Sequence, residues 1–433
     1  MDFIAGVIKE YKNMLRADNQ FIQLDGVLAQ CKRGPLGVML NLGCAPTPTP
    51  HALAKHSADA VLQSPLLRHS LTPLPAAVHR PFNYPFNETY CTLIPALLMG
   101  NSVVMKLPNV GCLAHICTME TYAKVFPPGV VNFISGAGRT TMPPIMQTGK
   151  VDIFAFIGGS KAADALIKIH PEPHRLKSSL ALDAKNLGVV MPDADLESAV
   201  AECVAGSLSY NGQRCTALKL LFVHTSVADA FLADFCDKVD AMKLGLPWES
   251  GTKLTPLPEP NKPAYLRELI DDAEALGAKV VNKTGKQANG PFVRPSVLYP
   301  VNSKMRVWHE EQFGPLVPIV PFTEIEDVYA YLASSIFGQQ ASVFTSEPSK
   351  YTELFDVLAN SVGRININAQ CQRGPDYFPF TGRKSSALGT LSITEALKTV
   401  SIESVVATKD NAKGKQGMLA LSSAQCNCVS TLI

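Results

Sequence analysis

The sequence lacks the long apolar runs and basic stripes that would assign it to a membrane or to nucleic acid. No window approaches the roughly 18 consecutive apolar residues of a membrane-spanning helix. Residues 1–20 show an amphipathic pattern with acidic side chains, which excludes a secretory signal peptide. The net charge is only +2, and no basic stripe interleaved with aromatic residues occurs. Neither a membrane nor a nucleic acid is therefore an expected partner.

The sequence also lacks the cysteine and histidine spacings of a metal site. Its eleven cysteines are odd in number and follow no secretory signal, which indicates reduced thiols in a cytoplasmic protein. Cys426 and Cys428 have no second pair at a ligand spacing. Four of the nine histidines lie in the proline-rich stretch 45–85, again without a ligand spacing. No metal is predicted.

What the sequence does contain is a regular alternation of strands and helices. With 433 residues, of which 46% are hydrophobic, the chain is long enough for two cores. Short apolar runs predict buried strands, and helical periods alternate with them. The expected strands include 35–43, 102–108, 130–134, 218–224 and 396–407, and the expected helices include 88–99, 227–242 and 261–276. This alternation predicts parallel βαβ units and an α/β fold.

Two short segments carry residues suited to chemistry. Residues 156–160, FIGGS, lie between a predicted strand and a predicted helix, where backbone N–H groups and the helix dipole favour a cofactor phosphate. A tight turn that needs glycine is the alternative. Cys215 follows Arg214, which favours the thiolate, and Asn211 with Gly212 can form a left-handed turn that exposes the thiol. The alternative for Cys215 is a buried structural thiol.

Distant segments, taken together in their order, resemble the aldehyde dehydrogenase superfamily. The segments are PFNYPFN (81–87), MKLPN (105–109), FIGGS, LALDAK (180–185), NGQRC (211–215), EEQFGPLVPI (310–319) and RGPDYFPFTGRKSSALG (373–389). Those around Cys215 and at 373–380 resemble the NADP-dependent non-phosphorylating glyceraldehyde-3-phosphate dehydrogenases. The resemblance covers residues 30–408 and implies a homodimer or homotetramer.

The resemblance also implies a domain organisation. A Rossmann-type cofactor domain would occupy residues 1–185, shortened at its N-terminus and carrying an insertion at 44–80. An α/β catalytic domain would follow over 186–389. A small oligomerisation strand is expected at 390–408, and a mobile tail at 409–433.

Individual roles follow from the resemblance as well. Cys215 would be the nucleophile, and the Asn83 amide would stabilise the oxyanion together with the Cys215 N–H. Hydride would pass to NADP rather than NAD, because the neutral Asn109 replaces a glutamate of NAD-preferring relatives. A surface acid and a core aromatic are the alternatives for Glu311 and Phe313. The positions that match cofactor contacts of the family are Lys106, Asn109, Gly159, Ser160, Glu311 and Phe313.

The predicted substrate is a small phosphorylated aldehyde. Tyr84, Arg214 and Arg373 match the triose-phosphate site of the subgroup, and guanidinium groups bind phosphate bidentately. Surface salt bridges are the alternative role for the two arginines. The resemblance thus implies oxidation of glyceraldehyde 3-phosphate to 3-phosphoglycerate.

One departure from the family pattern bears on the mechanism. In LALDAK, Ala181 stands where the family carries the glutamate that activates the deacylating water, and Asp183 with Ala184 replaces two glycines. A general base is typically worth about 10²–10⁴-fold in rate. The departure predicts slow or stalled hydrolysis of a thioester on Cys215.

Three functions therefore remain open at this point. The first is an active NADP-dependent aldehyde dehydrogenase. The second is a catalytically impaired relative that keeps cofactor binding or oligomer contacts. The third is an acylating enzyme that passes the acyl group to a thiol, a reaction that needs no water-activating base. Cys215, Asn83 and Glu311 favour the first and third functions, whereas Ala181 favours the second.

Overall fold

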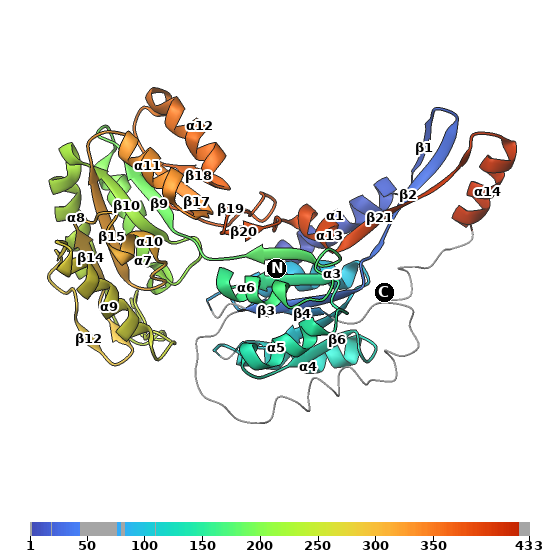
Figure 1. Ribbon diagram of the computed structural model, residues 1–433, viewed down its shortest axis with the longest axis horizontal. Coiled ribbons are helices and arrows are strands. Elements are labelled where there is room, and N and C mark those ends of the chain that lie inside the picture. The colour runs from blue at the N-terminus through green and yellow to red at the C-terminus, as the bar shows by residue number, and fades with distance from the viewer. Residues whose placement is uncertain (1, 19, 44–75, 79–82, 109, 424–433) are drawn as a thin grey trace. The chain divides into compact units, whose positions relative to one another are not determined.

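A computed structural model describes residues 2–18, 20–43, 76–78, 83–108 and 110–423, which form two compact units (Figure 1). The first unit comprises Met1–Leu180, Pro375–Pro379 and Gly389–Ile433, and the second comprises Ala181–Gly374 and Phe380–Leu388. The C-terminal part of the chain thus returns to the first unit. The assignment of cofactor and catalytic roles to these regions stays a prediction. The predicted insertion at 44–80 lies outside the described residues except for β4 (Ala76–Val78).

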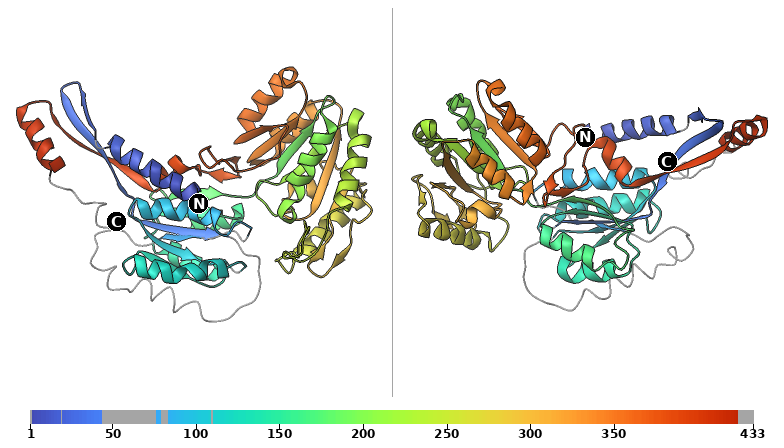
Figure 2. Two further views of the ribbon diagram at one scale, coloured as in Figure 1. Left: turned by 180° about the vertical axis from the view of Figure 1, so that it is seen from behind. Right: turned by 45° about the horizontal axis from the view of Figure 1, so that its top comes forward.

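The first unit is built on a parallel sheet. Short apolar segments form its strands, whose order is β8-β7-β3-β4-β5-β6. Chain order reverses beside β3, which pairs in parallel with both β5 and β7. In chain order, helix α3 (Asn87–Leu98) lies between β4 and β5, and helix α4 (Leu113–Val125) lies between β5 and β6 (Figures 1 and 2). The strands are β3 (Val38–Gly43), β4, β5 (Ser102–Lys106), β6 (Val131–Ile134), β7 (Ile153–Ile157) and β8 (Lys177–Ala181).

This arrangement confirms the predicted α/β fold and fixes where ligands approach. In an open parallel sheet, ligands bind beyond the carboxyl ends of the strands, where the strand order reverses. Helices α5 (Gly138–Gln147) and α6 (Ser160–Lys168) complete the alternation with the strands. The segment 156–160 therefore lies at the edge of the sheet where a dinucleotide would bind.

A three-stranded antiparallel sheet extends from the first unit. It contains β1 (Phe21–Leu24), β2 (Val27–Pro35) and β21 (Ser401–Lys409), with β2 in the middle. Helix α1 (Asp2–Asp18) packs near its base against α13 (Ile393–Thr399).

The C-terminal region corrects one sequence-based prediction. The strand expected at 396–407 begins only at Ser401, because α13 occupies the preceding residues. The Ser392 hydroxyl accepts a hydrogen bond from the Glu395 N–H, and this Ser-x-x-Glu capping signal starts the helix. The segment that follows β21 contains helix α14 (Ala412–Ser423), which packs against β21, and the mobility of the tail at 409–433 stays a prediction.

The second unit has a seven-stranded sheet in the order β11-β14-β15-β10-β9-β17-β18. The six strands that follow β11 in this order all pair in parallel with their neighbours. The short β11 lies at the edge and pairs antiparallel with β14. These strands are β9 (Asn186–Val190), β10 (Leu218–His224), β11 (Lys279–Val280), β14 (Ser296–Tyr299), β15 (Leu316–Phe322), β17 (Gln340–Phe344) and β18 (Arg364–Ile367).

Five longer helices and several shorter elements complete the second unit. The predicted helices at 227–242 and 261–276 are confirmed with slightly narrower bounds, and the predicted strand at 218–224 is confirmed as β10. The helices are α7 (Leu196–Leu208), α8 (Ala228–Asp240), α9 (Lys262–Ala275), α11 (Glu326–Ser334) and α12 (Thr352–Ser361). The shorter elements include α10 (Arg306–His309), β12 (Ala288–Asn289), β13 (Phe292–Val293), β16 (Phe337–Gly338), β19 (Arg383–Lys384) and β20 (Ala387–Leu388).

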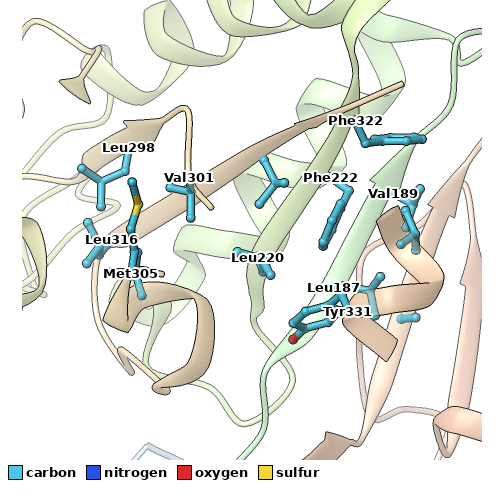
Figure 3. Close-up of a cluster of buried hydrophobic side chains, with 14 of the residues drawn as sticks. Leu187, Val189, Leu220, Phe222, Leu298, Val301, Met305, Leu316, Phe322 and Tyr331 are labelled. Carbon is cyan, nitrogen blue, oxygen red and sulfur yellow. The ribbon is translucent and has the colours of Figure 1, made fainter. Parts of the chain in front are cut away.

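The core of the second unit is a continuous apolar cluster around Phe222 (Figure 3). The ring of Phe222 lies 5.6 Å from Trp308 and 6.3 Å from Phe322, both in edge-to-face geometry. Tyr331 packs into the same cluster, and its hydroxyl donates to the Lys185 carbonyl at 2.9 Å. Buried aromatic packing of this kind stabilises the sheet to which β9 and β10 belong.

One buried acid in the first unit makes its stability dependent on pH. Asp152 precedes β7 and accepts a hydrogen bond from the Val38 N–H at 3.0 Å. Burial raises the pKa of Asp152 to about 6, although the Val38 N–H and Arg175 oppose the shift. A carboxyl whose pKa is higher in the folded state stabilises the fold while protonated, and this stabilisation is lost as pH rises through about 6.

Asp152→Asn should therefore stabilise the protein at neutral pH. Asparagine keeps a carbonyl oxygen that can accept from the Val38 N–H, and it carries no buried charge. Thermal unfolding followed from about pH 4 to about pH 7.5 should show a gain that grows with pH and is smallest at the acid end. A lower unfolding temperature than the wild type at neutral pH would contradict this expectation.

Candidate functional site

The segment that presents Cys215 leaves helix α7 through three consecutive left-handed residues. Tyr210, Asn211 and Gly212 have φ values of 53°, 59° and 68° within the 3₁₀ segment Ser209–Gly212. The predicted left-handed turn before Cys215 is thus confirmed. Left-handed backbone at non-glycine residues is costly, and it persists only where surrounding contacts hold it. Cys215 itself is half-buried at the end of this turn.

Side chains from a second loop hold the turn in place. The Asn211 side-chain oxygen Oδ1 accepts from the Thr255 N–H at 2.9 Å, and the Asn211 side-chain amide Nδ2 donates to the Thr255 hydroxyl at 3.1 Å. Gln213 donates to the Glu259 carboxylate at 2.8 Å. The contacts formed by Asn211 and Gln213 compensate for the strain of the left-handed turn that leads to Cys215.

Gly212 is the position in this turn that tolerates a side chain least. A Cβ added there would lie 2.6 Å from the Gly314 carbonyl oxygen and 2.8 Å from that of Ser207. Both atoms are backbone, so the clash adds to the strain of the positive φ. Gly212→Ala should reduce the free energy of unfolding by about 2–4 kcal/mol and slow the alkylation of Cys215.

The matched control for this substitution is Gly251→Ala. Gly251 has a φ of 76° in the same unit, but a Cβ added at this position would meet nothing within 4 Å. That variant should lose only the backbone strain, about 1 kcal/mol. Chemical denaturation and labelling with iodoacetamide measure both effects. Equal losses for the two variants would show that the contact with Gly314 does not matter.

The backbone carbonyl of Cys215 is held by two buried side chains. Asn186 at the start of β9 donates to it at 2.8 Å, and the Lys219 ammonium from β10 donates at 2.7 Å. The Lys219 ammonium also lies 3.1 Å from the Glu311 carboxylate, which accepts from the Ala184 N–H at 3.2 Å. Sequence reasoning assigned no role to Asn186 or Lys219, although a lysine inside an apolar strand was a visible signal.

Glu311 is thus brought close to the Cys215 segment within the second unit. Burial raises the pKa of Glu311, with a further rise from Asp183 and an opposing effect from Lys219. Its side chain is 15% exposed. The contact with Lys219 rules out the alternative of an isolated surface acid. A role in binding the cofactor stays a prediction.

Phe313 lies in the same loop and is half-buried, with a φ of 42°. The Lys262 ammonium lies 5.9 Å from the centre of its ring. Asp183 is half-buried and Ala184 fully buried between β8 and β9. Ala181 ends β8 and is 7% exposed, so an apolar methyl group stands where the resemblance implied a base.

The predicted substrate arginines have different surroundings. Arg214 is only 6% exposed, and it donates to the Gly206 carbonyl at 2.9 Å and to the Gln370 side chain at 3.2 Å. It therefore satisfies a carbonyl in the last turn of α7, a common role for a basic residue at a helix C-terminus. Arg373 lies over the Phe380 ring at 5.1 Å. Phosphate binding by both arginines stays a prediction.

The predicted cofactor, oxyanion and substrate residues of the first unit lie at three places. Lys106 is fully buried at the end of β5, and Ser160 begins α6 directly after Gly159. Both places lie at the carboxyl edge of the parallel sheet. Asn83 and Tyr84 are half-buried just before α3.

Some residues that the sequence singled out do not belong to the described ranges. Asn109 lies outside the described residues, as do the histidine cluster and the pair at Cys426 and Cys428. Within the described ranges, no three His, Cys, Asp or Glu side chains are grouped so that they could hold a metal ion. In the same ranges, no helix is long and apolar enough to cross a membrane.

The chain combines a doubly wound parallel sheet that has a glycine turn with a second α/β unit that contains a half-buried cysteine. A sheet of the first kind is found in many dinucleotide-binding proteins. The model of the aldehyde dehydrogenase family matches residues 75–406. The chain belongs to the aldehyde dehydrogenase family.

Relatives with known names define the similarity more closely. The chain is 32% identical over 318 residues to the NADP-dependent glyceraldehyde-3-phosphate dehydrogenase of Pisum sativum, a match that covers 73% of this chain and 62% of the relative. The enzyme of the same name from Streptococcus equinus is 33% identical over 327 residues, covering 74% and 66%. The chain therefore spans less than two thirds of the length of these relatives.

Solved structures agree with this similarity. The NADP-dependent glyceraldehyde-3-phosphate dehydrogenase of Bacillus halodurans C-125, crystallised with NADP, superposes with a TM-score of 0.80 at 30% identity. The superposition covers 95% of this chain and 78% of that structure. The resemblance predicted from the sequence is confirmed, and so is the aldehyde dehydrogenase-like fold.

Proposed function

We propose that this protein oxidises a small phosphorylated aldehyde with NADP as the hydride acceptor, and that glyceraldehyde 3-phosphate is the substrate. The observation that carries the proposal is the nucleophile segment. A half-buried Cys215 follows a strained left-handed turn, and its own carbonyl is clamped by Asn186 and Lys219. The similarity to NADP-dependent glyceraldehyde-3-phosphate dehydrogenases supports the choice of aldehyde and cofactor.

The residues at the edge of the first sheet fit a dinucleotide phosphate. Gly159 and Ser160 open helix α6, where backbone N–H groups and the helix dipole favour an anion. Lys106 ends β5 at the same edge of the sheet and, in this proposal, contacts the adenosine ribose or its phosphate. Glu311 and Phe313 are proposed to hold the nicotinamide half, and the neutral Asn109 would not repel a 2′-phosphate. Bound NADP supplies an acceptor for one hydride.

The proposed chemistry starts at the Cys215 thiolate. Its sulfur forms a bond to the aldehyde carbon, and the carbonyl oxygen becomes an oxyanion that accepts from the Cys215 N–H and the Asn83 amide. Loss of hydride from that carbon oxidises it and leaves a thioester. Attack by water then releases 3-phosphoglycerate and returns the thiolate. In this proposal Tyr84, Arg214 and Arg373 contact the substrate phosphate.

In the last step, this proposal departs from what the family resemblance implies, because position 181 holds an alanine in place of the expected base. Ala181 is an apolar, buried residue at the end of β8, and it cannot take a proton from water. This observation favours a second candidate function, in which the thioester accumulates or its acyl group passes to a thiol. A thiol acceptor forms a new thioester and releases the Cys215 thiolate without a water-activating base. A relative that binds NADP without turnover is the third candidate.

Thermal unfolding and NADPH formation test the proposed function together. NADP at about 100 times its dissociation constant should stabilise the protein by about 2.7 kcal/mol, and NAD at the same concentration by less. NADPH should form with glyceraldehyde 3-phosphate. With unphosphorylated glyceraldehyde, the rate of NADPH formation should be lower by about tenfold or more, because the buried contacts to the phosphate would be lost. Absence of both the thermal shift and NADPH with either aldehyde would refute the proposal.

We also propose that the chain forms a homodimer or homotetramer through the three-stranded extension. Apolar side chains are exposed on it, including Ile22 at 52%, Leu24 at 67% and Val405 at 63%. Exposed apolar patches of this kind mark interaction surfaces. Light scattering on the purified protein measures the mass directly, and a monomer would contradict this part of the proposal.

A further inference from the structure

A charged side chain is the second residue of a buried strand whose other residues up to Val223 are apolar. Lys219 is 1% exposed on β10, where its neighbours Leu218 and Leu220 are equally buried. Burying an ammonium group is costly unless it is paired and hydrogen-bonded. The partners of Lys219 therefore indicate what this residue does.

Both partners of the ammonium belong to segments that the proposed reaction uses. It donates to the Cys215 carbonyl at 2.7 Å and lies 3.1 Å from the Glu311 carboxylate. A carbonyl oxygen has two lone pairs, and the second donor to Cys215 is the Asn186 amide at 2.8 Å. Asn186 lies opposite Leu218 in the register of β9 and β10, so the two donors come from neighbouring parallel strands.

The Glu311 segment is fixed to β10 from the other side as well. Gln312 donates to the Lys219 carbonyl at 3.0 Å and to the Leu316 carbonyl at 2.9 Å. The Lys185 ammonium donates to the Gln312 side chain at 2.6 Å and to the Glu310 carbonyl at 2.7 Å. Lys219 thus takes part through both its main chain and its side chain, whereas Lys185 holds the loop without contacting Cys215.

We propose that Lys219 is a positioning residue for the Cys215 nucleophile. The Lys219 ammonium contacts both the Cys215 carbonyl and the Glu311 carboxylate, and so it fixes the backbone at Cys215. The sulfur then moves mainly by rotation about χ1. The inference rests on the proposed function and adds to it the residue that keeps the nucleophile in register with Glu311. A misplacement of the reacting atoms by about 1 Å can cost about 10²-fold in rate.

The test compares Lys219→Met with the matched control Lys185→Met. Each variant removes one fully buried ammonium from the same hydrogen-bonded network, but only Lys219 contacts Cys215. The first readout is the rate of Cys215 alkylation by iodoacetamide, measured by peptide mass spectrometry. The buried Cys203 and Cys371 in the same digest report whether the unit has opened.

The second readout is the dependence of the NADPH burst rate on aldehyde concentration at saturating NADP. Lys219→Met should lower the limiting burst rate by about tenfold or more and leave the half-saturating aldehyde concentration within about threefold. It should also slow Cys215 alkylation by about fivefold or more, because the thiol loses its fixed orientation and a nearby positive charge. Lys185→Met should keep the rate of Cys215 alkylation within about threefold of the wild type, because Lys185 does not contact Cys215.

Two outcomes would overturn the inference. One is a Lys219→Met variant whose Cys215 is alkylated at the wild-type rate, and the other is an equal loss in both variants. If Lys219→Met does not fold, Lys219→Gln is judged by the same readouts, because its amide is one bond too short to replace the ammonium. If the wild type forms no NADPH, the proposed function is refuted but the role of Lys219 is not. The rate of Cys215 alkylation still measures that role.

Discussion

Ala181→Glu should raise the steady rate of NADPH formation by about 10²–10⁴-fold, the usual contribution of a positioned general base. The reason lies in the last step, because the methyl group of Ala181 cannot accept a proton from the attacking water. The first turnover precedes that step, so its amplitude should not change. Stopped-flow absorbance separates the two phases in a single trace.

The control for this substitution is Ala181→Gln. Glutamine has the size of glutamate, so it imposes the same packing change at a position that is only 7% exposed. It has no basic oxygen, and its steady rate should stay at the wild-type level. A gain with glutamine would point to altered packing, and no gain with glutamate would show that more than the base is missing.

Cys215→Ser should reduce the first turnover by roughly 10⁴-fold or more, as removal of a catalytic nucleophile does elsewhere. A serine hydroxyl ionises far less readily than a thiol, so it attacks a carbonyl slowly unless a base activates it. The variant should still bind NADP, so its thermal shift should match that of the wild type. The readout is the NADPH burst after rapid mixing.

The matched control is Cys236→Ser. Cys236 is half-buried on α8, as Cys215 is in its own loop. Burial raises the pKa of Cys236 to about 11, with nearby Asp240 adding to the shift, so it carries little thiolate near neutral pH. Its loss should leave the burst unchanged. A burst that survives in Cys215→Ser would assign the nucleophile to another residue.

The regular parts of the fold were predictable because period and propensity determine them locally. The strand at β10 and the helices at α8 and α9 were placed within one or two residues of their observed ends. The strand predicted at 396–407 was partly wrong. There the capping pair Ser392 and Glu395 starts a helix, and the apolar pattern of a strand applies only after it.

The site was predictable only in part, because its supporting contacts link residues far apart in sequence. The left-handed turn before Cys215 was predicted from Asn211 and Gly212. The two hydrogen bonds to the Cys215 carbonyl were not predicted. They depend on the pairing of β9 with β10, which brings Asn186 beside the Cys215 segment. The buried environment of Arg214 also depends on tertiary packing, in this case at the end of α7.

We expect Cys215 to be acylated readily and its acyl group to be released slowly, because position 181 holds no base. Rapid mixing with NADP and glyceraldehyde 3-phosphate, followed by acid quenching and peptide mass spectrometry, tests it most directly. We predict one NADPH per active site in the burst, with the acyl group on the peptide that contains Cys215. Sustained turnover at the burst rate, without an acylated Cys215 peptide, would contradict the claim.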